Sequence, residues 1–209
     1  MYLIKNLSYS FKDGEKLFRN LYPKLPLEKI SVIGGANGSG KTTLCSILTG
    51  LIKDYQGTIF LKSNNLSAMN ILQISKEVIF IRQDTKGNTI GITLDEDLSI
   101  LQNKFQYKDN EIKIAQRIEA LDAFNLREYR YEPMWKLSSG QRKAGLSASL
   151  ALNMDKYWIL DEPSNSLDKD KSANLIKLIE QKKSKGTGAV IVTHQTDLFE
   201  DIADINYSL

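Results

Sequence analysis

The segment GANGSGKT, residues 35–42, has the spacing G-x-x-x-x-G-K-[ST]. Glycines allow a tight turn that brings several backbone N–H groups toward phosphate oxygens, and the positive end of a following helix attracts the same anions. We expect Lys41 to reach the β- and γ-phosphates of a nucleotide and the Thr42 hydroxyl to ligate Mg²⁺. A simple glycine turn is the alternative, but the strand-like and helix-like flanks favour a phosphate-binding loop.

A pair of acids ends the apolar run YWILDEP, residues 157–163. Asp161 is expected at the C-terminal edge of a strand, where ligands bind in open α/β sheets, and there it is predicted to hold Mg²⁺. Adjacent strand residues point to opposite faces, so the neighbouring Glu162 is predicted to polarise an attacking water. Taken alone the pair also fits a surface turn, but the phosphate-binding loop upstream favours a metal site.

The chain has a single histidine, His194, directly after the apolar run GAVIVT at residues 188–193. A lone histidine is most often a solvated or structurally satisfied residue. Here it follows a predicted parallel strand, at the sheet edge where phosphates are expected to bind. This position favours a functional role for His194.

Strand-like and helix-like segments alternate along the chain, which predicts a mainly parallel sheet covered on both faces. The strand-like segments are residues 2–11, 29–35, 57–62, 77–83, 157–163 and 188–194, and the helix-like segments are residues 41–52 and 168–183. The pattern changes between Asp84 and Lys136, where residues 111–126 have helical spacing. We therefore expect one domain, with an α/β core formed by 1–83 and 137–209 and a helical subdomain at 84–136.

The composition excludes several classes of protein. A net charge of +3 is too small to indicate nucleic-acid binding. The one cysteine, Cys45, permits no intramolecular disulfide and is expected in the core, which favours a reducing compartment. No apolar run reaches the roughly 18–20 residues needed to span a bilayer. We expect a cytoplasmic protein that reaches a membrane only through a partner.

The segment LSSGQRK, residues 137–143, precedes a helix-like stretch that leads to the acid pair. With it the chain resembles the nucleotide-binding domain of the ABC (ATP-binding cassette) ATPases, whose signature is LSGGQ. The residues that carry the resemblance are GANGSGKTT at 35–43, Gln83, LSSGQ at 137–141, ILDEP at 159–163, SLD at 166–168 and His194. They occur in family order across essentially the whole chain.

The resemblance implies an α/β P-loop NTPase with a mainly parallel sheet, an N-terminal antiparallel β subdomain and a helical insertion. It also implies ATP hydrolysis with ATP and Mg²⁺ as cofactors. The implied catalytic residues are Lys41, Gln83, Glu162 and His194, and the implied metal ligands are Thr42, Gln83 and Asp161. The implied nucleotide contacts are Phe11, Gly35, Ala36, Asn37, Gly38, Ser39, Gly40, Lys41, Thr42, Thr43, Ser138, Gly140, Gln141 and Asp168.

The family also implies a role for several of these residues. Phe11 matches the aromatic that stacks on adenine, with Tyr9 as an alternative. Gln83 matches a glutamine that contacts Mg²⁺ and senses the transmembrane partner. Glu162 resembles the catalytic base, and His194 matches a switch histidine that contacts the γ-phosphate.

The signature segment has a physical logic of its own. Ser138, Gly140 and the N–H groups that open a helix at Gln141 make an anion site. In ABC proteins this site serves the ATP of the opposite subunit, and Asp168 matches a residue that communicates across that dimer. Ser139 stands where the family usually has glycine, so it is expected either to crowd the phosphate or to need a different backbone angle.

The resemblance favours an energy-coupling subunit of an ABC transporter. Two copies, in a homodimer or a heterodimer, would close head-to-tail around two Mg-ATP and drive a membrane permease, which docks on the helical insertion and Gln83. The chain ends 15 residues after His194, so we expect it to lack the C-terminal regulatory domain of some import ATPases, which favours export. The small size resembles compact exporters of peptides, bacteriocins or haem. The alternative is a soluble ABC ATPase without a transport role, in translation, DNA maintenance or iron–sulfur assembly. A P-loop kinase would lack LSSGQ.

Overall fold

The computed structural model describes residues 2–11, 14–84, 88–103 and 110–209. The chain divides into two compact units, and each is described by itself. Unit 1 comprises Met1–Phe80, Lys156–Glu162 and Lys182–Leu209. Unit 2 comprises Ile81–Asp155 and Pro163–Gln181.

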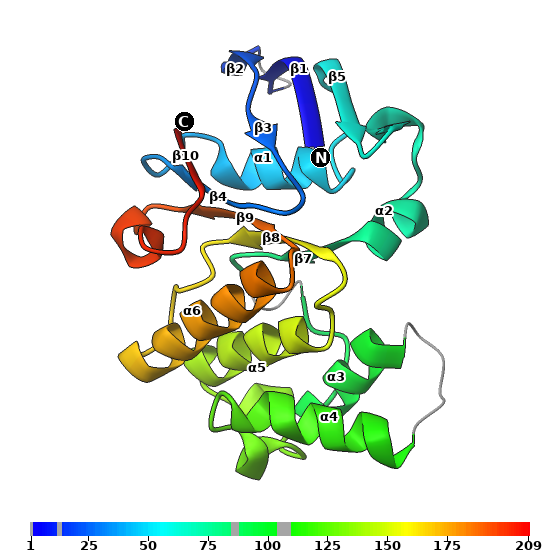
Figure 1. Ribbon diagram of the computed structural model, residues 1–209, viewed down its shortest axis with the longest axis vertical. Coiled ribbons are helices and arrows are strands. Elements are labelled where there is room, and N and C mark those ends of the chain that lie inside the picture. The colour runs from blue at the N-terminus through cyan, green and yellow to red at the C-terminus, as the bar shows by residue number, and fades with distance from the viewer. Residues whose placement is uncertain (1, 12–13, 85–87, 104–109) are drawn as a thin grey trace. The chain divides into compact units, whose positions relative to one another are not determined.

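Unit 1 contains a sheet with the strand order β10-β4-β9-β8-β7. The bounds are β10 Ile205–Ser208, β4 Ile30–Gly34, β9 Ala189–Thr193, β8 Tyr157–Asp161 and β7 Val78–Ile81, whose last residue belongs to unit 2. The pairings of β10 with β4, β4 with β9 and β8 with β9 are parallel. Figure 1 shows the three central strands β4, β9 and β8 side by side. Every residue of these strands is buried, as expected for the interior of a parallel sheet. Their carboxyl ends therefore meet at one edge of the sheet.

A second sheet in unit 1 is antiparallel, with the order β2-β1-β5-β6 and β3 paired with β1. The bounds are β1 Tyr2–Ser10, β2 Lys16–Leu21, β3 Lys24–Leu25, β5 Gln56–Leu61 and β6 Asn64–Asn65. It is followed by the short helices η1 Leu66–Ala68 and α2 Ile71–Glu77. These two sheets confirm the predicted mainly parallel sheet with an N-terminal antiparallel part.

Helix α1, Lys41–Leu48, joins the two sheets of unit 1 into one core. Its buried face packs against β8 and β9, and the hydroxyl of Tyr2 in β1 donates to the Leu48 carbonyl at 2.7 Å. Cys45 is completely buried in this core, as expected from the sequence. Burial, and after it the charge of Asp161, raises the pKa of the Cys45 thiol. The helix that follows the predicted phosphate-binding loop is thus fixed by apolar packing.

The helices of unit 2 are α3 Leu94–Asn103, α4 Glu111–Asp122, α5 Ser139–Ala151 and most of α6 Lys169–Ser184, with the short turns η2 Arg127–Tyr129 and η3 Met134–Lys136. A buried ion pair ties α4 to α3, because Arg117 Nε lies 3.0 Å from Asp95 Oδ1. Arg117 also donates to Gln102 at 3.0 Å, and Arg130 Nε lies 2.7 Å from the same Asp95 oxygen. A buried guanidinium is tolerated here because it is paired with the Asp95 carboxylate.

No helix within the described part of the chain is long and apolar enough to cross a membrane.

Candidate functional site

The predicted phosphate-binding loop connects the end of β4 at Gly34 to the start of α1 at Lys41. Gly38 and Gly40 have φ of +86° and +96°, a region that side chains rarely adopt. Gly40 is also the N-cap of α1, and no side chain caps the first turn. The opening N–H groups of α1 therefore suit an anion at this end of the helix.

Glycine is required at position 40 for a steric reason as well as for its backbone angle. A Cβ atom at this position would lie 2.6 Å from Phe18 Cε1 and 2.8 Å from Leu17 Cδ2. Both side chains come from β2, and Phe18 is buried. Strand β2 thus packs directly against the loop, a contact that the sequence analysis did not predict.

The Lys41 side chain is buried and turned back onto its own loop. Its Nζ donates to the carbonyls of Gly35 at 2.8 Å and Ala36 at 3.0 Å, and it lies 3.7 Å from Glu162 Oε1. These contacts place one cation beside the loop and the predicted base at the same time. The negative charge of Glu162 makes the buried ammonium group tolerable.

Glu162 follows β8 directly, is 3% exposed and has a φ of +46°. Its Oε2 accepts a hydrogen bond from the Thr193 hydroxyl at 2.9 Å, and its Oε1 accepts from the His194 backbone N–H at 3.1 Å. His194 Nδ1 lies 2.9 Å from Oε2. The structure therefore brings Lys41, Glu162 and His194 together in unit 1, with a left-handed backbone at the carboxylate that only surrounding contacts can maintain.

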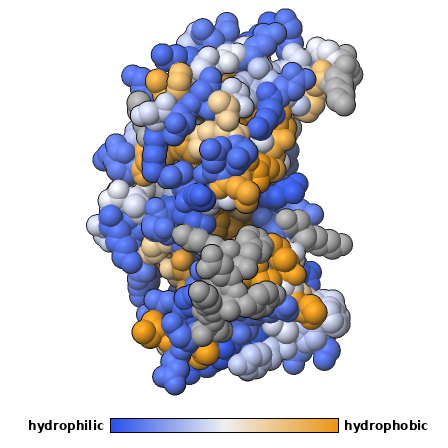
Figure 2. Space-filling view, turned by 90° about the vertical axis from the view of Figure 1, so that its right-hand side faces the viewer, coloured by the Kyte–Doolittle hydropathy of each residue, from blue (hydrophilic) through white to orange (hydrophobic). Residues whose placement is uncertain are grey.

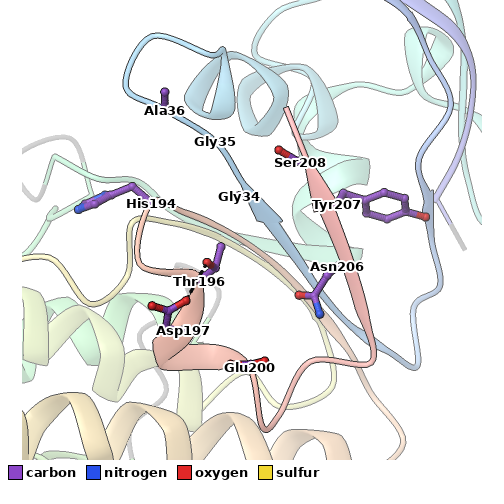
Figure 3. Close-up of a pocket in the computed structure, with 10 residues that line it drawn as sticks. All are labelled: Gly34, Gly35, Ala36, His194, Thr196, Asp197, Glu200, Asn206, Tyr207 and Ser208. Carbon is purple, nitrogen blue, oxygen red and sulfur yellow. Dashed lines mark hydrogen bonds between the residues drawn. The ribbon is translucent and has the colours of Figure 1, made fainter.

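A pocket of about 700 Å³ opens between the start of the loop, the short helix η4 Thr196–Phe199 and β10. Figure 3 shows the His194 ring at one side of it and the carboxylates of Asp197 and Glu200 on the side of η4. A Cβ at Gly34 would lie 2.8 Å from Thr196 Cγ2, so glycine is needed where the pocket wall approaches the strand. His194 is thus partly open to solvent, with 43% of its side chain exposed.

The residues of unit 1 fit Mg²⁺ as well as phosphate. Thr42 is the second residue of α1, Asp161 is the buried last residue of β8, and the two elements pack together. A hydroxyl and a carboxylate are hard oxygen ligands of the kind that Mg²⁺ prefers. Gln83, the third predicted ligand, is an exposed residue after β7 and belongs to unit 2.

The aromatic residues predicted for adenine also lie in unit 1. Phe11 follows β1 and is 40% exposed, and its ring meets that of Tyr9 edge-on with the centroids 5.5 Å apart. An exposed, supported ring suits stacking on a base. Adenine stacking by Phe11 stays a prediction, with Tyr9 as the alternative.

The signature segment in unit 2 begins α5 with a capping box. The Ser138 hydroxyl accepts from the Gln141 N–H at 3.1 Å, and Gln141 Oε1 accepts from the Ser138 N–H at 2.8 Å. Ser139 is the first residue of the helix and has no positive φ. The expectation that Ser139 needs a different backbone angle is therefore wrong, because an ordinary helical backbone suits serine; crowding of a phosphate remains the other possibility.

Gly140 brings the signature segment against the SLD loop within unit 2. A Cβ at Gly140 would lie 2.7 Å from the Ser166 carbonyl oxygen, and Ser166 itself has a φ of +69°. In the same loop Asp168 Oδ1 accepts from the Lys171 N–H at 2.8 Å at the start of α6, and its other oxygen pairs with the Lys171 ammonium. The hydrogen bond from that ammonium holds the pKa of Asp168 below its ordinary value.

Two residues of the site escaped the sequence analysis. Phe18 lies in β2, a strand that carries no strong alternation in its sequence, and Thr193 looks like the last residue of a core strand. No single segment of the sequence marks Thr193, because its place beside Glu162 follows from the pairing of Asp161 with Val192 in the two strands.

A family model described as ABC transporter matches residues 18–165. The chain belongs to the ABC transporter family. This ABC protein is 30% identical over 197 residues to an energy-coupling factor transporter ATP-binding protein of Thermotoga maritima, covering 93% of this chain and 74% of that protein. It is 27% identical over 212 residues to the cobalt import ATP-binding protein CbiO of Salmonella typhi, covering 100% of this chain and 77% of the relative.

The fold of the ABC protein matches a solved structure, a dimeric ATP-binding cassette in a post-hydrolysis state bound to ADP and Pi. The TM-score is 0.87 at 21% identity, covering 100% of this chain and 94% of the other. The ABC protein is thus an ATPase with ATP and Mg²⁺ as cofactors and the ATP-binding subunit of an ABC transporter. The expected exporter subfamily and export direction are not supported, because relatives that cover the whole chain are named for import.

Proposed function

We propose that this subunit hydrolyses ATP in an import-type ABC transporter, as one of two copies that close on Mg-ATP. The observation that carries the proposal is the buried Glu162 carboxylate, held by the end of β9 and 3.7 Å from the ammonium of Lys41. A buried carboxylate with fixed hydrogen-bond donors is a suitable general base. The import direction is supported by the relatives, since the cobalt protein aligns over the entire chain.

Each of the proposed site residues in unit 1 has its own role in ATP hydrolysis. We assign the loop of residues 35–43 to phosphate binding, with Lys41 exchanging its two carbonyl partners for phosphate oxygens. Glu162 accepts a proton from the attacking water, and His194 orients the terminal phosphate and that water. Thr42 and Asp161 would hold Mg²⁺, which would supply positive charge toward the phosphates, and ligation by Gln83 stays a prediction.

The residues of unit 2 serve the nucleotide of the other copy in this proposal. Ser138, Gly140 and Gln141 stand at the capped start of α5, where the helix dipole favours an anion. Asp168 carries the signal between the two copies. With two identical chains the dimer has two equivalent sites, and with a related second chain the sites differ.

A docking surface for the permease is proposed on the helical subdomain, which we place at 84–136. Ile92, Tyr131 and Trp135 are 58%, 69% and 73% exposed. The segments that carry them run together, since the N–H of Met134 donates to the Ile92 carbonyl at 2.8 Å. Figure 2 shows hydrophobic residues exposed among hydrophilic ones on one face of the chain. We take the exposed apolar side chains on the two joined segments as the mark of a protein interface.

The Glu162→Gln variant tests the ATPase proposal. It is expected to bind ATP, to hydrolyse almost none, and to accumulate as a dimer because hydrolysis is its exit from the closed state. Light scattering with Mg-ATP measures the dimer, and a variant that stays monomeric would refute the two-copy model. His194→Ala should lower kcat far more than ATP affinity, because orientation of the phosphate matters most in the transition state.

The docking surface has its own test. Trp135→Ser should reduce copurification of the membrane subunit after mild detergent extraction, while Tyr22→Ser, a comparably exposed aromatic in unit 1, should not. Equal recovery of the membrane subunit with both variants would refute the docking surface.

Two further experiments test the transporter role and its direction. If no membrane protein copurifies with the unmodified protein, the soluble ATPase is favoured. Uptake, rather than release, of cargo by cells that carry the transporter tests the direction.

A further inference from the structure

Thr193 is the last residue of β9 and is completely buried beside the carboxylate of Glu162. Its Oγ1 lies 2.9 Å from Glu162 Oε2. The adjoining residues of the two strands fix this proximity, because Asp161 pairs with Val192 and the Glu162 N–H donates to the Val192 carbonyl at 2.9 Å. The hydroxyl is thus built into the sheet edge at the proposed base.

A second contact decides the direction of this hydrogen bond. The backbone N–H of Gln195 donates to Thr193 Oγ1 at 3.0 Å, so the hydroxyl oxygen already acts as an acceptor on that side. An ionised carboxylate only accepts, so the hydroxyl proton of Thr193 must point to Glu162. The β-branched side chain has few rotamers, which keeps the hydroxyl in place.

Two other side chains that contact the Glu162 carboxylate have a second partner in the proposed function. The side chains of Lys41 and His194 are both assigned to phosphate, so in the proposed function they divide their contacts between Glu162 and the nucleotide. The Thr193 hydroxyl and the His194 backbone N–H belong to the framework of β9 and remain. Without them the carboxylate would rotate about its last torsion, which is intrinsically soft.

We propose that Thr193 is a positioning residue for ATP hydrolysis, whose hydroxyl holds the Glu162 carboxylate in the orientation that accepts a proton from the attacking water. The inference rests on the proposed role of Glu162 as the base. Thr193 touches no substrate and acts through Glu162. Correct orientation of a general base is needed for proton transfer, whereas ATP binding does not depend on it.

The test compares Thr193→Val, Thr193→Ser and Thr193→Cys with the unmodified protein in steady-state ATP hydrolysis. Valine keeps the shape and removes the donor, so kcat should fall by about tenfold to a hundredfold, as for loss of a hydrogen bond to a charged group. The KM for ATP should change little, and the Mg-ATP dimer should last longer. Serine should restore most of kcat, and cysteine, a weaker donor, should give an intermediate value.

Thr49→Val is the matched control. Thr49 is a buried threonine of unit 1 whose hydroxyl donates to the Cys45 carbonyl at 2.8 Å. Its hydroxyl bonds to the backbone of its own helix and not to Glu162. This variant should lose stability but keep kcat. Comparable losses of kcat in Thr49→Val and Thr193→Val would show that Thr193 only supports the fold.

The remaining outcomes separate the inference from the proposed function. If Glu162→Gln abolishes hydrolysis and Thr193→Val does not lower kcat, the positioning role is refuted and the base stands. If Glu162→Gln hydrolyses ATP normally, the proposed function itself fails. Should Thr193→Val not fold, the serine and cysteine variants decide, because equal kcat for both would overturn the inference and a lower kcat for cysteine would support it.

Discussion

Replacing Gly40 by alanine is expected to be the most costly single methyl addition in the phosphate-binding loop. Two effects add at this position. The φ of +96° costs an alanine about 1–2 kcal/mol. The new Cβ would also lie 2.6 Å from Phe18 Cε1 and 2.8 Å from Leu17 Cδ2, so buried side chains must move, at about 1–3 kcal/mol.

Gly38→Ala separates the two effects. Gly38 has a similar φ of +86°, but a Cβ there would meet no heavy atom within 4 Å. It should therefore lose only the backbone contribution of about 1–2 kcal/mol. The difference between the two variants should be about 1–3 kcal/mol, or about 2–12 °C in Tm for a chain of this size.

Thermal unfolding of the nucleotide-free variants measures this difference, since bound ATP would stabilise the folded state by mass action. Adding Phe18→Leu to Gly40→Ala should recover part of the loss, because it removes the ring atoms that the new methyl group meets. Equal Tm values for Gly38→Ala and Gly40→Ala, or no recovery in the double variant, would refute the steric argument.

Three further outcomes are expected. Lys41→Ala should lose most of its affinity for ATP in titration calorimetry, because the only side-chain cation assigned to the phosphates is removed; an unchanged Kd would contradict the loop assignment. Ser139→Gly should hydrolyse ATP at an equal or higher rate, and a large loss would make the serine a functional contact. Asp204→Asn should destabilise the protein at neutral pH by about 1–3 kcal/mol, measured by urea unfolding. Burial works to raise the pKa of Asp204, but the Ile30 N–H and the Lys183 ammonium hold it below its ordinary value. The destabilisation of Asp204→Asn should therefore shrink as the pH falls below about 4 and Asp204 is protonated; a destabilisation that persists in acid would contradict the lowered pKa.

The sequence predicted the elements that are determined by their own residues and not by contacts with other segments. Apolar runs marked the buried parallel strands, and the glycine spacing marked the loop between β4 and α1. The two-residue strand β3 carries no periodic signal, because it is defined by its partner β1 rather than by its own residues. The contact of Phe18 with Gly40 likewise depends on how β2 packs, which no single segment encodes.

The candidate site was likewise predicted only in part from the sequence. Lys41, Glu162 and His194 were named from motif positions, but the hydrogen bonds of Glu162 with Thr193 and His194 require the register of β8 and β9. Export, the direction expected from the sequence, is not supported, because relatives that cover the whole chain are named for import. The motif residues of the chain are those of ATP binding and hydrolysis, so they hold little information about direction or cargo.

The placement of the two tryptophans gives each unit an optical reporter of its own. Trp158 in β8 is completely buried in unit 1 with the Lys182 ammonium 4.3 Å from the centre of its ring, whereas Trp135 in unit 2 is 73% exposed. A dry indole fluoresces at shorter wavelength than a hydrated one and is shielded from dissolved quenchers. With Trp135 replaced by phenylalanine, the remaining emission reports the exposure of Trp158 when unit 1 unfolds. With Trp158 replaced instead, quenching of Trp135 reports whether a permease covers the docking surface.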